Sequence, residues 1–165
     1  MPHDAIELDD GTLLIAETGA HHLVQMSAEG EIVRVVADDM AAPIGLAQKD
    51  ADTVYFTAAA AGTVSMISLE TGDHKIIASD LMQPEGITID REGKILVIDA
   101  VARSLMRIDP DSGRKRILID DLPLGLQGPP RRHPTWLHND VVVGTDGTIY
   151  LNSDTVTAIY KIVPH

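Results

Sequence analysis

A unit of about 40 residues recurs four times along the chain, and this period limits the possible folds more than any other feature. In each copy a turn residue precedes a short apolar run. These turn residues are Gly11, Asp52, Gly93 and Gly147, of which the first three are evenly spaced and the fourth follows after one period and an insertion. The runs that follow read TLLIAET, TVYFTAA, KILVIDA and TIYLNSD. A fixed period of this length with several short strands per copy is typical of β-propeller blades.

The strands within each copy can be placed from the third, residues 84–108. There we expect strands at 87–90 and 94–98 and a third from Ser104, each bounded by glycine or acidic turn residues. The same pattern predicts four strands in each of the first three copies and three in the last, which lacks an outer strand. We therefore expect an all-β propeller, as a single domain or a fragment of one, with blades at about 2–42, 43–83, 84–137 and 138–165 and an insertion at 122–138.

Composition excludes several classes of partner. The 165-residue chain carries 13 basic and 25 acidic side chains, for a formal charge of −12, which disfavours nucleic acid and anionic membranes. It has no cysteine, so disulfides and thiolate metal sites are excluded. We find neither a membrane-spanning apolar run nor a signal peptide, and we expect a soluble chain. These features do not distinguish a cytoplasmic from an exported protein.

Residues 84–108, PEGITIDREGKILVIDAVARSLMRI, resemble an NHL-type repeat. More broadly they are similar to the six-bladed propeller superfamily that includes gluconolactonases with senescence marker proteins, paraoxonases and strictosidine synthase-like proteins. Four blades can close as a compact ring, pair with a second chain, or form part of a longer ring. Because each copy resembles blades of six-bladed proteins, we favour part of a six-bladed ring. Self-association through open blade edges is an alternative.

The resemblance also implies a metal site at the start of the inner strands. In the lactonase-like families this position supplies oxygen ligands to calcium or a similar divalent ion, and here it holds His3, Ile44, Glu85 and Asn139. Glu85 and Asn139 match in residue type, whereas the other two do not. The pair Asn139-Asp140 is similar to an Asn-Asp pair of paraoxonase-like proteins, in which the first residue meets a catalytic calcium and the second a structural one. Since calcium takes six to eight oxygens, water or other blades would complete the shell.

The insertion, residues 122–138, should cover the same face as Asn139, and long loops in compact domains are often functional. Within it, Arg131, Arg132 and Trp136 are candidate substrate-binding residues. Simpler roles are also open, because the arginines suit a solvated loop. Likewise Glu85 suits a solvated turn, and Asn139 a strand cap. Asp99 recurs with Glu17 at one offset from the turn residues, which favours loop hydrogen bonding over catalysis.

Two functions remain after these exclusions. The first is a divalent-metal-dependent lactonase or ester hydrolase acting on a small molecule, with Glu85 and Asn139 as metal ligands and His138 or Asp140 as the base that activates water. The second is a non-catalytic NHL-type propeller that binds a protein or a small ligand. The sequence does not settle whether the chain is an enzyme, and it does not indicate the substrate.

Overall fold

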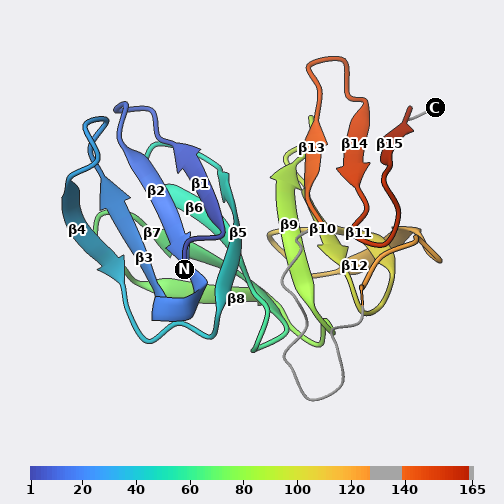
Figure 1. The fold of residues 1–165 in the computed structure, drawn as a ribbon, viewed down its shortest axis with the longest axis horizontal. Helices are drawn as coiled ribbons and strands as arrows, with labels where there is room; N and C mark the ends of the chain where they lie inside the picture. Colours follow the sequence, from blue (N-terminus) through green and yellow to red (C-terminus); the bar gives the residue numbers. More distant parts are fainter. Residues whose placement is uncertain (127–138, 164–165) are drawn as a thin grey trace.

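The computed structural model describes residues 1–126 and 139–163. These residues form four antiparallel sheets, one for each sequence repeat, arranged about a common axis (Figure 1). The all-β propeller predicted from the repeat is confirmed. A short 3-10 helix, Thr18–Ala20, follows the second strand. In the part of the chain that is described, no helix has the length and apolar character needed to cross a membrane.

Within each sheet the strands pair in chain order from the axis outward. The first blade contains β1 (Asp4–Glu7), β2 (Leu13–Glu17), β3 (His22–Met26) and β4 (Ile32–Ala37). The second contains β5 (Pro43–Gln48), β6 (Thr53–Ala58), β7 (Thr63–Ser68) and β8 (His74–Ala78). The third contains β9 (Pro84–Ile89), β10 (Ile95–Asp99), β11 (Ser104–Ile108) and β12 (Lys115–Ile119). The fourth contains β13 (Val141–Val143), β14 (Ile149–Asn152) and β15 (Ile159–Ile162).

The turn residues that mark the sequence period connect the first two strands of each blade. Gly93 has a φ of +73°, a left-handed conformation that glycine adopts without steric cost. Just before it, the carboxylate of Asp90 accepts hydrogen bonds from the backbone N–H groups of Glu92 and Lys94. Such local bonds are the reason why aspartate and glycine favour tight turns. The sequence repeat thus reflects the aspartate and glycine residues that these turns favour.

The core consists of three apolar clusters, each lying between neighbouring blades. Between the first and second blades, Leu14 and Leu23 pack with Val54, Phe56 and Ile67, all nearly inaccessible to solvent. Equivalent clusters join the second blade to the third and the third to the fourth. Burying one side chain of this size contributes about 1.5–3 kcal/mol. Stability therefore depends on contacts between blades rather than within a single sheet.

Glycines let the inner strands approach one another closely near the axis. A Cβ added at Gly86 would lie 2.5 Å from Cα of Asp140, and one at Gly45 would lie 2.5 Å from the carbonyl oxygen of Glu85. Both distances are too short for any side chain carbon. Only glycine fits at these two positions, and the starts of β5, β9 and β13 consequently lie side by side.

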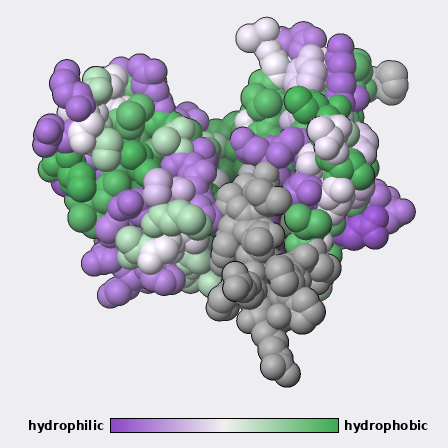
Figure 2. All heavy atoms as spheres, viewed as in Figure 1, coloured by the Kyte–Doolittle hydropathy of each residue, from purple (hydrophilic) through white to green (hydrophobic). Residues whose placement is uncertain are grey.

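The outward face of the last blade differs from the same face of the others. Leu14, Tyr55 and Leu96 occupy one repeat position and are buried against the following blade. At that position in the fourth blade, Tyr150 is only half-buried, and Val142 and Ile159 nearby are 56% and 75% exposed. Figure 1 shows two lobes, one with the first two blades and the other with the last two, and Figure 2 shows a notch between the lobes. Figure 2 shows apolar residues on the lobe that contains the first blade. On β4 of that blade, Ile32, Val33 and Val35 are exposed.

Candidate functional site

Glu85 and Asn139, from neighbouring blades, are in direct contact near the axis. Glu85 is the second residue of β9, and Asn139 lies two residues before β13. The Glu85 carboxylate oxygen Oε2 accepts hydrogen bonds of 2.9 Å from both the backbone N–H and the side-chain Nδ2 of Asn139. The two residues are 2% and 0% exposed, so Glu85 is not a solvated turn residue. The fold thus brings together the two residues proposed as metal ligands.

Two further hydrogen bonds hold these side chains in one orientation. The side-chain amide of Gln83 donates to Oε1 of Glu85 at 2.7 Å. The backbone N–H of Asp154 donates to Oδ1 of Asn139 at 2.9 Å. The amide of Asn139 therefore has its nitrogen toward Glu85 and its oxygen toward Asp154, and a flipped amide would lose both bonds. Each of the oxygens Oε1 and Oδ1 keeps a lone pair beyond the bond it accepts.

Thr57, on β6 of the second blade, forms hydrogen bonds to the backbone of the same site. Its hydroxyl donates to the backbone carbonyl oxygen of Glu85 at 2.6 Å and accepts from the backbone N–H of Gly45 at 2.8 Å. Thr57 is fully buried. One side chain thereby links the inner strands β5 and β9 at the level of Glu85.

Among the residues that the structure describes, no positively charged side chain is bonded to Glu85. Its three hydrogen-bond donors in these ranges are neutral amides, and burial raises the pKa of its carboxyl above the ordinary value. The carboxylate of Asp154 adds to this effect. A desolvated carboxylate with only neutral partners is stabilised by a nearby cation, and carboxylate and amide oxygens are ligands that calcium prefers. The donor chemistry of Glu85 and Asn139 thus fits a divalent ion.

The rest of a metal shell is not provided by acidic or histidine side chains among residues 1–126 and 139–163. Within these ranges no group of three or more such side chains is placed to hold a metal ion. Of the other inner-strand positions, Ile44 is a buried apolar residue and His3 is half-buried. Backbone carbonyls and water are the remaining sources of oxygen.

Asp140 lies on the other side of β9 from the Glu85 side chain. Its Oδ1 would be 2.7 Å from a Cβ added at Gly86, and neighbouring residues of a strand point to opposite faces. The same oxygen accepts the backbone N–H of Val141 at 2.8 Å. Although the residue is exposed overall, partial burial of its carboxylate raises its pKa, and the carboxylate of Asp4 adds to the shift. The structure thus separates Asp140 from the Glu85 and Asn139 pair.

The other predicted site residues fall outside the described ranges. His138, a candidate base, and Arg131, Arg132 and Trp136, the candidate substrate-binding residues, belong to residues 127–138. They remain predictions. Of the insertion, the structure describes residues 122–126.

Two aspartates, Asp99 and Asp154, accept hydrogen bonds from the backbone of the loops beside the site. Asp99 is fully buried and accepts hydrogen bonds from the backbone N–H groups of Met82, Gln83 and Ala102, as the loop-bonding interpretation predicted. This carboxylate positions the residue whose side chain binds Glu85. Asp154 was not identified from the sequence. Its carboxylate accepts the backbone N–H groups of Gly125 and Leu126, at 3.0 and 2.7 Å. No repeat landmark marks Asp154, because its partners belong to the insertion.

The sequence matches no family model and no curated protein. Solved structures, in contrast, share the fold. Virginiamycin B lyase from Staphylococcus aureus superposes with a TM-score of 0.65 at 15% identity, over 99% of this chain and 56% of the lyase. A protein assigned by its family to the gluconolactonases gives a TM-score of 0.75 at 14% identity, over 99% of this chain and 60% of that protein. A chain of a nidogen and laminin complex gives 0.69 at 15% identity, over 98% and 75%.

These similarities confirm the resemblance to NHL-type and gluconolactonase-like propellers at the level of the fold. The chain spans little more than half of the length of the lyase and three fifths of the gluconolactonase relative. A lyase and a chain of a nidogen and laminin complex thus share this architecture. The fold alone therefore does not choose between catalysis and binding.

Proposed function

We propose that this chain is a divalent-metal-dependent hydrolase of the lactonase or esterase type, acting on a small molecule. The observation that carries the proposal is the buried contact between Glu85 and Asn139, which brings a carboxylate and an amide of neighbouring blades together near the axis. The fold is shared with a gluconolactonase relative and with a lyase. Calcium is the ion that this set of hard oxygen ligands suits best.

In this proposal each residue of the site has a defined task. Glu85 and Asn139 would hold the ion through Oε1 and Oδ1, the oxygens that keep a lone pair. Gln83 and the backbone N–H of Asp154 hold those two side chains in place. A bound divalent cation would supply polarisation of an ester carbonyl and charge stabilisation of the developing oxyanion.

A base is also required, because hydrolysis consumes a water molecule that must lose a proton. Asp140 is the described candidate, and its raised pKa brings the carboxyl closer to the range in which bases work near neutral pH. His138, the neighbouring residue in the sequence, is the alternative base. Since Asp140 lies on the Gly86 side of β9, its use as a base requires that substrate and water reach that side.

Calorimetric titration with calcium tests the metal site without any assumption about the substrate. We expect saturable binding of one ion per chain, lost in Glu85→Gln and Asn139→Ala and retained in the control Glu7→Gln, which changes an exposed glutamate on β1. Hydrolysis of γ-butyrolactone and p-nitrophenyl acetate, with and without chelator, then tests the reaction. A folded protein that binds no calcium contradicts the proposal.

One observation favours a second function, that of a non-catalytic binding propeller. The outward face of the last blade exposes Val142 and Ile159, and a chain of the nidogen and laminin complex has the same fold. Calcium binding without hydrolysis of either ester would support this alternative. Metal content and turnover together therefore distinguish the two functions.

A further inference from the structure

Two arginines face each other across adjacent strands of the third blade. Arg107 on β11 pairs in register with Arg116 on β12. Like charges directly opposite one another destabilise a sheet unless other groups neutralise them. The chain as a whole is strongly acidic, so this local concentration of positive charge is not a consequence of composition.

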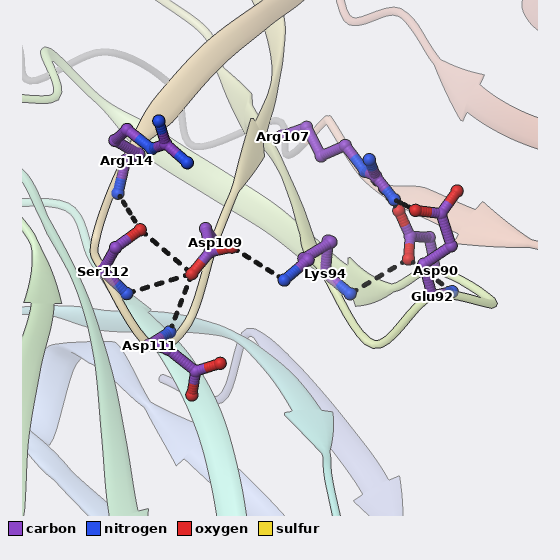
Figure 3. A network of polar contacts seen from close by, with 8 residues as sticks. All are labelled: Asp90, Glu92, Lys94, Arg107, Asp109, Asp111, Ser112 and Arg114. Carbon is purple, nitrogen blue, oxygen red and sulfur yellow. Dashed lines mark hydrogen bonds and ion pairs between the residues drawn. The ribbon is translucent and has the colours of Figure 1, made fainter.

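Only one of the two is neutralised by the protein in the described ranges. Figure 3 shows the Arg107 guanidinium directed at Asp90 and Glu92, to which it is bound at 2.6 and 2.9 Å. These contacts raise the pKa of Arg107. Arg116 is exposed, and its side chain makes no hydrogen bond or ion pair within residues 1–126 and 139–163. Its charge is available to another molecule.

In the first blade, the arginine at the equivalent strand position has hydrogen-bond partners. Arg34 lies opposite Gln25, as Arg116 lies opposite Arg107. The guanidinium of Arg34 donates to Oε1 of Gln25 at 2.8 Å and to the backbone carbonyl of Leu69 in the next blade. In the third blade the neutral acceptor Gln25 is replaced by a second cation. The replacement converts an internal hydrogen bond into an unpaired guanidinium.

A cavity of about 480 Å³ lies beside Arg116, between the third and fourth blades. Its lining combines apolar side chains, among them Leu96, Leu118 and Ile149, with Arg91, Arg107 and Arg116. The Arg91 side chain extends across to the fourth blade, since its Cδ would be 3.1 Å from a Cβ added at Gly147. Like Arg116, it is exposed and has no ion pair within the described residues.

The acidic groups of the cavity are already bound to other residues. Asp90 accepts from Arg107 and from backbone N–H groups, which outweigh burial and lower its pKa. Asp146 accepts the backbone N–H and the hydroxyl of Thr148, at 2.9 and 2.8 Å; both partners are neutral, so its carboxylate keeps its negative charge, but it forms no ion pair with Arg91 or Arg116. Two unpaired guanidinium groups therefore remain beside an apolar surface.

We propose that this cavity binds a small amphipathic organic anion, with its carboxylate on Arg116 and Arg91 and its apolar body against Leu96, Leu118 and Ile149. A guanidinium matches a carboxylate in shape as well as in charge. An inorganic anion would use the arginines but leave the apolar surface in water. The size of the cavity is in the range of small-molecule sites.

This site is separate from the candidate metal site. Glu85 is near the start of β9 and Asp90 follows its end. Five residues of extended chain span about 16 Å. The proposal consequently does not depend on the hydrolase function, and each can fail without the other.

Titration of the protein with sodium octanoate, followed by calorimetry and by amide NMR shifts, tests the proposal. Acetate and hexanoate serve as shorter probes, and octanol as a neutral one. We expect saturable binding of one octanoate per chain, with affinity rising up to about fourfold for each added methylene. Arg116→Gln should weaken binding by about tenfold or more, because a hydrogen bond to a charged group is lost.

The matched control is Lys75→Gln. Lys75 is exposed at the same strand position of the second blade, where it lies opposite Met66 rather than an arginine. This variant should bind octanoate like the wild type. The proposal is overturned if octanoate does not bind saturably, if Arg116→Gln and Lys75→Gln bind equally well, or if acetate binds as tightly as octanoate.

Discussion

Replacing Thr57 with valine should destabilise the propeller strongly, although the two side chains have the same shape. Thr57 is fully buried, and its hydroxyl bonds the N–H of Gly45 and the carbonyl of Glu85. Valine offers neither an acceptor nor a donor. A buried donor left without a partner costs about 1–3 kcal/mol, and loss of the second bond adds about 0.5–1.5 kcal/mol. We expect Thr57→Val to lower the free energy of unfolding by about 2–4 kcal/mol.

Urea unfolding measures this loss. With a denaturant slope of about 2 kcal/mol per molar, the middle of the usual range, the midpoint should fall by roughly 1–2 M, with the slope unchanged. Thr88→Val is the matched control, since Thr88 lies on β9, is half-buried, and its hydroxyl has no hydrogen bond within the described residues. The reasoning is refuted if the unfolding free energies of Thr57→Val and the control agree to within about 0.5 kcal/mol, the range usual for substitutions that disturb no buried contact.

Three further predictions concern the site and the open end of the propeller. Asp99→Asn should lower the free energy of unfolding by about 2 kcal/mol, because both carboxylate oxygens accept loop N–H groups and the amide nitrogen that replaces one of them accepts none. An unchanged midpoint in urea unfolding would contradict this prediction. Since burial raises the pKa of Glu85, the wild type should lose stability as pH rises from the ordinary value of 4.5 through the higher folded-state pKa. Glu85→Gln should then be more damaging at pH 4 than at pH 7 in chelator-containing buffer, and equal losses at both pH values would argue against a desolvated carboxylate. The outward face of the last blade, with Tyr150 and exposed Val142 and Ile159, leads us to propose self-association. The sedimentation coefficient of the wild type should rise with protein concentration, and Ile159→Glu should suppress this rise. A wild-type coefficient that stays constant would rule out self-association.

The sequence by itself determined the blade architecture, because turn chemistry and alternating burial repeat with the period of the fold. The strand predicted at 94–98 is observed at Ile95–Asp99, and the fourth blade has three described strands as expected. The inner strand of that blade begins later than the sequence suggested, at Val141 rather than Asn139. There the backbone N–H groups of Asn139 and Asp140 bond the side chains of Glu85 and Asn152 instead of a neighbouring strand.

Only the tertiary structure decided how the chemically important side chains are paired. Residue type pointed to Glu85 and Asn139, but their contact, and the roles of Gln83 and Asp154 in orienting them, depend on how neighbouring blades pack. The unpaired charge of Arg116 was likewise invisible, because a basic residue on an outer strand has no distinguishing pattern. A periodic sequence specifies local backbone and burial, which repeat. Side-chain contacts between blades do not repeat, since each depends on two different copies.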